Sequence, residues 1–384
     1  MSSAFLPSPK RGEGKKKSEF LVSNTHSKVE AAIKAFAKGE IVVVTDDDDR
    51  ENEGDLFVAA SLCTPEKMAF IIRHTSGIVC ATITAADARR LHLDPMVAKN
   101  DAPLGTAFTV TIDVKHGLTT GISAEERTNT VRALANDNMG AADFARPGHV
   151  FPLIAREGGV LMRTGHTEAC TDLCKLAGLP AVGVLSELMN DDGTVMRGPQ
   201  VAAFAAQHKL AQISVADLIA YRQAREKLVT RVGDFSLTSD IGTMQGYAYV
   251  TPFDRVHHMA FVYGDIGDGK DVPARLHRAD VIGDVFGGAK SIRSALKVFK
   301  SAGRGVIVYL RDGTAGVPVT EIPQEGATET DTARSQQWRD VGLGAQILKD
   351  LGISSIRLLS SSHRTYVGLG GFGSEIAGTE VLES

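Results

Sequence analysis

The sequence predicts an α+β protein of two domains, each containing both strands and helices. With 384 residues, the chain is longer than one average domain. Helix-like and strand-like segments alternate along both halves, and the pattern weakens between residues 227 and 243 before a second series of strands begins. We therefore expect a disordered tail rich in Ser, Pro, Gly and Lys over residues 1–18, a first domain over 19–227 and a second over 228–384.

In the first half, apolar residues at helical spacing predict a helix over 29–38, which Gly39 ends, followed by a β-branched strand over 41–44. Ser123 is a predicted N-cap for a helix over 124–136, and Gly178 ends a helix over 168–176. The remaining predicted elements are helices over 65–73, 201–208 and 215–226 and strands starting at 77, over 106–114 and over 182–185.

In the second half, the sequence predicts a hairpin from strands over 247–250 and 259–263, followed by a Gly/Asp-rich turn over 264–270. A helix over 291–302, a strand over 306–310 and a helix over 338–351 complete it, and the polar segment 323–334 is predicted to be a mobile loop.

The composition excludes several classes of protein. A formal net charge of -4 argues against a general nucleic-acid binder, which needs a basic face. No apolar run approaches the length of a membrane span, and no apolar stretch follows the basic N-terminal residues as in a secretory signal. The four cysteines include the pair Cys170 and Cys174, four residues apart; we favour buried, reduced thiols over a zinc site, and hence a cytoplasmic setting.

An acidic loop directly follows the first predicted strand. Residues 46–55 (DDDDRENEGD) contain seven carboxylates in ten positions. Such crowding is repulsive unless a cation or an arginine lies within it, and Mg²⁺ prefers oxygen ligands. Arg50 offers a planar fork for a phosphate or carboxylate, and Gly54 lets the backbone turn or approach a ligand closely. The alternative is a solvated acidic turn.

A second group of polar residues precedes the predicted helix over 168–176. Arg163 and the backbone amides of Gly165 and Thr167 are suited to holding a phosphate at a helix N-terminus. His166 is a candidate metal ligand or base. Thr167 is equally consistent with a simple helix cap.

Seven ordered motifs between residues 25 and 222 resemble 3,4-dihydroxy-2-butanone-4-phosphate synthase, an enzyme family of riboflavin biosynthesis. They are DDDDRENEGD (46–55), RHTSGIVC (73–80), GTAFTVTID (105–113), TTGISAEER (119–127), RPGHVFPL (146–153), GGVLMRTGHTEA (158–169) and GVLSELMNDDGTVMR (183–197). The resemblance implies a carbon–carbon lyase that converts D-ribulose 5-phosphate into 3,4-dihydroxy-2-butanone 4-phosphate and formate.

The resemblance also implies the roles of individual residues. Glu51 and His166 are expected to bind one or two Mg²⁺ or Mn²⁺ ions, and His149 and Glu187 to be catalytic. Cys80 is expected to line the pocket or to be a buried small residue. The expected substrate-binding residues are Arg50, Glu51, Asp55, Arg163, Thr164, Gly165, His166 and Thr167.

This chemistry requires the proton beside the substrate carbonyl to be removed, and a divalent cation stabilises the enediolate as a Lewis acid. We expect Glu187 or Asp55 to move that proton, and His149 to orient an oxygen or act as a second acid or base. In the family the site lies near a homodimer interface, so we expect at least a dimer that binds a small phosphorylated sugar, with no nucleic acid and no membrane as partner.

Residues 251–383 resemble GTP cyclohydrolase II, whose catalytic zinc is held by three cysteines. In this chain Asp280 occupies the first cysteine position, and Gly287-Gly288-Ala289-Lys290 replaces the C-x-C segment. The family's Q-E-G-R segment has become residues 312–316 (DGTAG), and no cysteine follows Cys174. Since thiolates make the zinc site, we expect no bound zinc and no cyclohydrolase activity.

An inactive second domain has two plausible uses, a scaffold or a regulatory nucleotide or phosphate pocket, and we favour the scaffold. His257, His258 and His277 are alternative metal ligands, and the pair His363–Arg364 a possible anion contact. Two other hypotheses are a protein in which both halves have lost their chemistry and a bifunctional enzyme with non-cysteine zinc ligands. The intact residues of the first half argue against the former.

Overall fold

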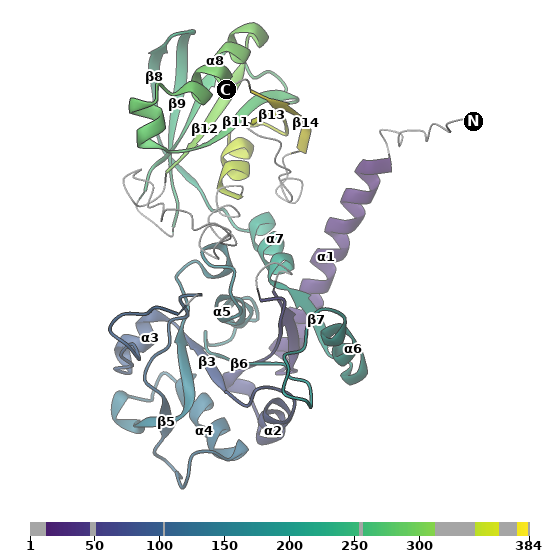
Figure 1. Cartoon of the computed structure of the whole chain (residues 1–384), viewed down its shortest axis with the longest axis vertical. Helices are drawn as coiled ribbons and strands as arrows, with labels where there is room; N and C mark the ends of the chain where they lie inside the picture. Colours follow the sequence, from purple (N-terminus) through teal and green to yellow (C-terminus); the bar gives the residue numbers. More distant parts are fainter. Residues whose placement is uncertain are drawn as a thin grey trace, which may run out of the picture. The chain divides into compact units, whose positions relative to one another are not determined.

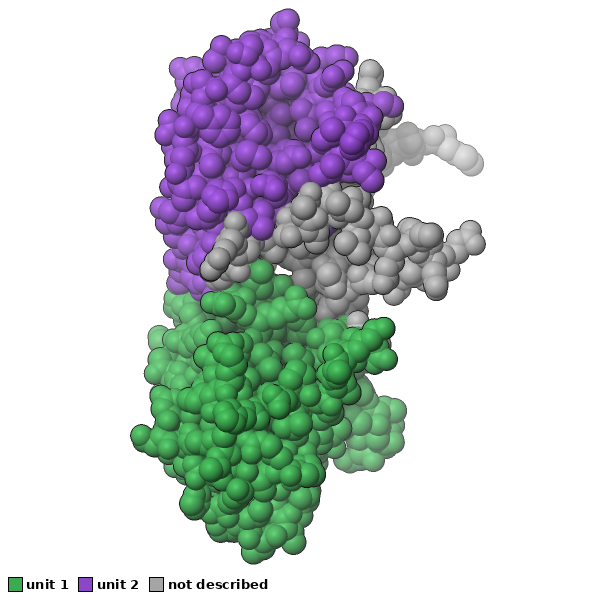
Figure 2. Space-filling view, turned by 90° about the vertical axis from the view of Figure 1, so that its left-hand side faces the viewer, with its two compact units in different colours: residues 1–221 green, residues 222–384 purple. Residues whose placement is uncertain are grey.

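The computed structural model describes residues 13–46, 51–102, 104–252, 256–311, 342–360 and 375–382, with side chains from residue 25 onward. The chain divides into two compact units, residues 1–221 and 222–384, which Figure 2 shows in different colours. The predicted boundary between residues 227 and 228 lies a few residues after this division. In the described part of the chain, no helix is both long and apolar enough to span a membrane.

Unit 1 is built on a seven-stranded mixed sheet with the strand order β4-β5-β3-β6-β2-β1-β7 (Figure 1). β1 and β2 pair antiparallel, as do β2 and β6, whereas β3 and β5 are parallel. The strands are β1 (Val42–Thr45), β2 (Gly54–Ala59), β3 (Cys80–Ile83), β4 (Ile112–Val114), β5 (Phe144–Ile154), β6 (Gly183–Glu187) and β7 (Ala211–Ser214).

Helices cover both faces of this sheet. One face carries the main apolar core of the unit, to which Val43 of β1, Leu56 of β2 and Val131 of α4 belong. Helix α5 packs on β2, β3 and β6, and also contacts α1. The helices are α1 (Glu13–Ala37), α2 (Pro65–His74), α3 (Ala85–Arg90), α4 (Ala124–Leu134), α5 (His166–Leu176), α6 (Pro199–His208) and α7 (Val215–Arg225), with short 3-10 turns η1 (Ala60–Leu62), η2 (Ala141–Asp143) and η3 (Gly159–Leu161).

Because side chains alternate across a strand, the polar residues of β2 and β6 fall on the face opposite that core. Asp55 is the cross-strand partner of Glu187, and Leu185 pairs with both Phe57 and Cys80. Cross-strand partners share a face, as do residues two positions apart on one strand, so Asp55, Glu187 and Cys80 lie on the side where α5 begins with His166. The sheet thus supplies a fixed row of polar side chains.

Unit 2 contains a second seven-stranded sheet, with the order β14-β13-β11-β12-β10-β9-β8. Helix α8 packs on β11 and β12, and Phe299 of α8 is fully buried. Its elements are β8 (Thr230–Ser239), β9 (Gly242–Val250), β10 (His258–Tyr263), β11 (Val272–Arg278), the π-turn η4 (Ile282–Phe286), α8 (Lys290–Ala302), β12 (Gly305–Leu310), β13 (Ser355–Ser360) and β14 (Glu375–Val381). Residues 342–350 are also helical.

The predicted α+β class and the two-domain organisation are confirmed, with differences in single elements. Helix α1 begins at Glu13, so residues 13–18 are helical where a tail was predicted, and residues 1–12 lie outside the described part. The predicted strand over 106–114 is reduced to β4, preceded by isolated bridges at Phe108 and Thr109. Strand β8 was missed because most of its side chains are exposed and carry no apolar alternation.

Candidate active site

The acidic loop is anchored by the side chain of Asp46, which is buried at the end of β1. Its carboxylate accepts hydrogen bonds from the backbone N–H of Glu51 (3.1 Å) and of Glu53 (2.9 Å). The Asp46 N–H in turn donates to the Glu53 carbonyl oxygen at 3.3 Å. These bonds hold the backbone of Glu51 and Glu53 against the end of β1, which fixes the position of Glu51. The predicted Arg50 lies outside the described residues.

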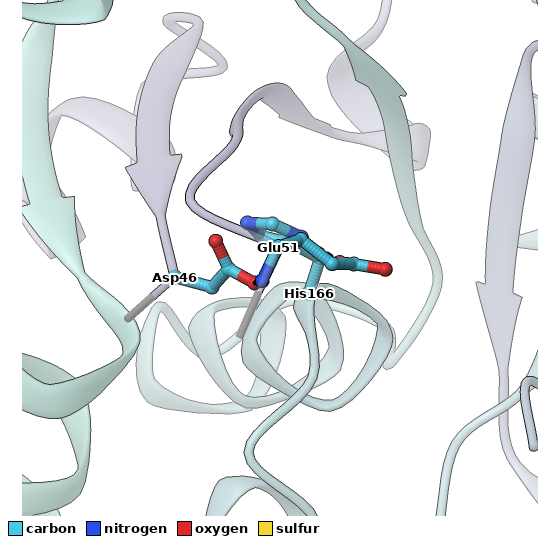
Figure 3. Close-up of side chains that lie close together, drawn as sticks. All are labelled: Asp46, Glu51 and His166. Atoms are coloured by element: carbon cyan, nitrogen blue, oxygen red, sulfur yellow. Dashed lines mark hydrogen bonds and ion pairs between the residues drawn. The ribbon is translucent and has the colours of Figure 1, made fainter. Parts of the chain in front are cut away.

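Asp46, Glu51 and His166 bring one potential ligand atom each within 4.8 Å of one another. Figure 3 shows the three side chains converging from the end of β1, the acidic loop and the first turn of α5. His166 Nδ1 lies 3.7 Å from Glu51 Oε2, and the His166 ring packs edge-on to Phe57 with centroids 6.0 Å apart. In the described part of the chain this is the one such group of three.

The donor set of this group fits a hard divalent cation. Two carboxylates and one imidazole leave coordination positions for water and substrate oxygens, as Mg²⁺ and Mn²⁺ sites require. The Asp46 carboxylate is oriented by the hydrogen bonds that it accepts from two backbone N–H groups. These three residues would hold the cation, and His166 is 7 % exposed, so the site has a dry floor and an open side toward Glu51.

Asp55 is the most deeply buried acid of the site. It is 1 % exposed, and its Oδ1 accepts no hydrogen bond from the described residues although His166 Nδ1 lies 3.7 Å away. Burial raises the pKa of Asp55 to about 8, with His166 opposing the shift and the carboxylates of Glu187, Glu51 and Asp46 adding to it. A carboxyl group of this kind is suited to proton transfer near neutral pH.

Glu187 lies beside Asp55 on the neighbouring strand and is partly exposed. Its Oε2 accepts a hydrogen bond of 2.8 Å from the Ser76 hydroxyl, and its carbonyl oxygen accepts the Ser76 N–H at 2.8 Å. Cys80 is 2 % exposed, and burial raises the pKa of its thiol well above the usual range, with Glu187 and Asp55 adding to the shift. A buried thiol in this state is neutral and a poor nucleophile.

His149 is held by a buried aspartate. Its Nδ1 lies 2.7 Å from Asp113 Oδ2, and its backbone N–H donates to Asp113 Oδ1 at 2.9 Å. Asp113 is 3 % exposed, whereas the His149 side chain is 42 % exposed. Gly121, at φ 85°, covers this pair so closely that a Cβ there would collide with both side chains. The imidazole is thus oriented with its Nε2 edge available to a ligand.

The predicted phosphate-binding segment 163–167 is buried at the start of α5. The Arg163 guanidinium donates to Glu168 Oε2 at 2.7 Å, to the Leu104 carbonyl oxygen at 3.0 Å and to the Thr106 hydroxyl at 3.3 Å. A Cβ on Gly165 would collide with the Arg163–Glu168 pair, so glycine is required there. Thr164 and Thr167 are buried beside it. In this state Arg163 fastens the 104–106 segment to α5.

Sequence reasoning missed two residues that organise the site. Asp46 had a detectable signal, since it is the first carboxylate after the β1 strand and can accept amides of its own loop. Asp113 had none, because its pairing with His149 depends on the register of β4 and β5 and on the irregularity between Ile112 and Asp113.

Gly54 does not adopt the positive φ of a tight turn, so that part of its interpretation is wrong. A Cβ at this position would meet Val201 of α6 at 2.5 Å, so the glycine allows close packing of α6. We therefore expect Gly54→Ala to lower the free energy of unfolding by about 1–3 kcal/mol through overpacking. Urea unfolding at equilibrium measures this. The double variant Gly54→Ala/Val201→Ala should recover part of the loss, whereas equal unfolding curves for wild type and Gly54→Ala would contradict the packing argument.

In unit 2, Asp280, the residue at the first expected cysteine position, borders a polar network of Asp284, His277 and Tyr309. Oδ1 of Asp284, in η4, lies 2.9 Å from His277 Nε2. Oδ2 of the same carboxylate accepts hydrogen bonds from the Tyr309 hydroxyl at 2.7 Å and from the Asp280 N–H at 3.0 Å. The rings of His277 and Tyr309 stack with centroids 5.3 Å apart. These groups satisfy one another, so the network stabilises the turn. Residues 312–316 and the pair His363–Arg364 lie outside the described residues.

This network predicts that unit 2 is sensitive to acid. Burial lowers the pKa of His277 despite the opposing carboxylate of Asp284. Since the folded state favours neutral imidazole, its stabilising contribution is present above the ordinary pKa of 6.5 and is lost as the pH falls through the lowered value. The protection factors of β11 and β12 amides, which correct the exchange rates for the intrinsic rate at each pH, should therefore fall between about pH 7 and 5. The fall should be smaller in His277→Asn; equal pH dependence of the protection factors in both proteins would refute it.

Each of the two units matches a known protein family. A family model for 3,4-dihydroxy-2-butanone 4-phosphate synthase matches residues 30–221, and one for GTP cyclohydrolase II matches residues 230–381. The chain belongs to the 3,4-dihydroxy-2-butanone 4-phosphate synthase family. It is a two-domain member, in which the synthase domain is fused to a GTP cyclohydrolase II-like domain, as the sequence motifs predict.

Two relatives from Arabidopsis thaliana differ in their described activities. A bifunctional riboflavin biosynthesis protein of the chloroplast is 44% identical over 93% of this chain and 69% of its own length. A monofunctional riboflavin biosynthesis protein of the chloroplast is 45% identical over 90% of this chain and 75% of its own length. Relatives that align with both units of this chain are therefore described as having either one or two functions.

Two crystal structures of synthases resemble the chain. RibBX, a two-domain 3,4-dihydroxy-2-butanone 4-phosphate synthase from A. baumannii, superposes with a TM-score of 0.78 at 33% identity and covers 93% of this chain and 99% of its own. A second synthase structure, at 44% identity and a TM-score of 0.51, covers 51% of this chain and 97% of its own and holds two magnesium ions. Together with the Asp46–Glu51–His166 group, it confirms the predicted use of Mg²⁺, while the ligand roles of Glu51 and His166 stay predictions.

Proposed function

We propose that unit 1 converts D-ribulose 5-phosphate into 3,4-dihydroxy-2-butanone 4-phosphate and formate. The observation that carries this proposal is the convergence of Glu51 and His166 beside the buried acid Asp55. A hard cation site next to a carboxyl group that titrates near neutral pH matches a reaction that proceeds through enediolates. Family membership supplies the substrate class, a phosphorylated sugar.

In this proposal the bound cation supplies Lewis-acid stabilisation to oxygens of the substrate. Asp55 and Glu187, adjacent on β2 and β6, exchange the proton at the carbon beside the carbonyl. Ser76 keeps Glu187 oriented through its 2.8 Å hydrogen bond. Cys80 excludes water from the pocket floor as a neutral thiol. Arg50, with the segment Arg163 to Thr167, holds the phosphate end, which requires Arg163 to exchange contacts with Leu104 or Thr106 for the substrate.

His149 lies too far along the sheet to act at the metal group of its own chain. Phe151 pairs with Cys80 on β3, and Cys80 pairs with Leu185 on β6, so β5 is two strands away from Glu187 and three from Asp55. At ~4.8 Å between neighbouring strands, β5 lies about 10 Å from β6 and about 14 Å from β2. We therefore propose a homodimer in which the exposed His149 of one subunit completes the pocket of the other.

We further propose that unit 2 has no cyclohydrolase activity and stabilises the synthase. The chain has no cysteine after Cys174, and His277 and Asp284 bond to each other. Zinc-dependent ring opening needs three ligands and an activated water. The relative named monofunctional aligns with 90% of this chain and is a precedent for one activity in a protein that contains both regions, and the bifunctional relative makes the direct assay necessary.

Two incubations of the purified chain test these proposals separately. With ribulose 5-phosphate and Mg²⁺, we expect formate release that EDTA abolishes; its absence would overturn the synthase proposal. With GTP and Zn²⁺, we expect neither formate nor pyrophosphate. Release of both would show that unit 2 is a cyclohydrolase with ligands other than cysteine.

A further inference from the structure

A cavity of about 330 Å³ lies in unit 2, where the end of helix α7 meets the helix over residues 342–350. Residues 223–227 and Val229 form one wall, and Gln346, Lys349 and Asp350 form the other. Its volume is at the lower end of the range of small-molecule sites. It shares no residue with the metal group of unit 1.

A buried amide with unused hydrogen-bonding capacity lines this cavity. Gln223 is 5 % exposed, and within the described residues its side-chain Oε1 has no hydrogen-bond partner. Leaving such a group unpaired in the interior is unfavourable. A ligand that donates a hydrogen bond, such as a hydroxyl group, would satisfy it.

The cavity also has a surplus of positive charge. Its two carboxylates are already neutralised by arginines, because Glu226 pairs with Arg222 and Asp350 pairs with Arg231 at 2.7 Å. Lys227 and Lys349 are exposed and form no ion pair with a described residue. Two ammonium groups at the mouth of a small cavity attract an anion.

The C-terminal end of α7 would by itself repel an anion, but the structure removes much of this effect. The Gln346 side-chain amide donates to the carbonyl oxygens of Gln223 at 3.2 Å and of Glu226 at 2.7 Å. Its Oε1 accepts the Leu228 N–H at 2.6 Å. The carbonyl groups that carry the negative end of the helix dipole are thus partly occupied.

We propose that this cavity is a second ligand site, specific for a small hydroxylated phosphate monoester. The phosphate contacts Lys227 and Lys349 at the mouth, and a hydroxyl group of the ligand donates to Gln223 Oε1. Since residues 226–229 connect α7 to β8, the ligand fixes this connection against the helix over residues 342–350. Unit 2 then acts as a sensor of phosphorylated metabolites.

Isothermal titration of the full chain with glycerol 3-phosphate in EDTA tests this proposal. We expect saturable binding that weakens at least about tenfold in the double variant Lys227→Gln/Lys349→Gln, because charge-assisted bonds are lost. Gln223→Leu should weaken glycerol 3-phosphate and leave inorganic phosphate unaffected, since phosphate has no such hydroxyl. The matched control is Lys297→Gln/Lys300→Gln, which removes two exposed lysines from α8.

Three outcomes would overturn the site. They are no saturable binding to the wild type, equal binding to the wild type and the Lys227/Lys349 variant, or an equal loss in the α8 control. The second would place the binding elsewhere in the chain, and the third would assign it to general electrostatic attraction. The formate assay does not enter this test, so failure of the ligand site and failure of the synthase proposal are distinguishable.

Discussion

Replacing Glu51 or His166 by alanine is expected to reduce formate release from ribulose 5-phosphate by at least about a thousandfold, because each removes a ligand of the cation that stabilises the enediolate. Glu51 and His166 approach to 3.7 Å in the structure, and the loop that holds Glu51 is fixed by Asp46 through two backbone hydrogen bonds. The side chains therefore act as a unit, and either loss should be nearly complete.

The matched control is Glu53→Ala in the same loop. Glu53 lies 3.4 Å from Arg197 and is not among the three grouped ligands, so its removal changes the loop charge while leaving the cation site intact. Mn²⁺ binding measured by electron paramagnetic resonance provides a readout independent of turnover. We expect weak Mn²⁺ binding in Glu51→Ala and His166→Ala and near-normal binding in Glu53→Ala. Normal Mn²⁺ binding in the first two would remove both residues as ligands.

How far the sequence predicts this protein depends on the range of the interactions involved. Helix α4 follows from Ser123 and Glu126, which form a capping box three residues apart, and β1 from a run of β-branched residues. The extent of α1 does not follow in this way, because its first residues carry the basic, polar composition of a tail. Similarly, β14 alternates between exposed and half-buried positions and has no strong apolar signal.

The site shows the same limit more sharply. Glu51 and His166 are 115 positions apart, and only the resemblance joined them before the structure placed α5 against β2. The Asp113–His149 pair and the packing of Gly54 on Val201 depend on strand register and helix placement, which local patterns do not encode. Chemistry was predictable from residue types, whereas the supporting contacts were not.

The position of His149 has the largest consequence for how the enzyme is assembled. Asp113 is buried and forms hydrogen bonds with both the ring and the backbone N–H of His149. Burying a carboxylate is unfavourable, so this arrangement is not expected for a histidine that only faces solvent. The imidazole is half-exposed, so its Nε2 can contact a group that does not belong to this sheet. Within one chain, the nearest acid of the site, Glu187, lies two strands away.

Mixing two inactive variants should therefore restore activity. In a dimer formed from one His149→Ala subunit and one Glu51→Ala subunit, one of the two pockets receives its metal ligands from the first subunit and an intact His149 from the second. If subunits mix randomly, half of the dimers are mixed and half of their pockets are complete, so formate release should recover to about a quarter of wild type. Each variant alone should stay inactive. If mass spectrometry shows mixed dimers but activity does not recover, His149 acts in the pocket of its own chain. It would then have to cross the distance of about 10 Å that separates β5 from β6.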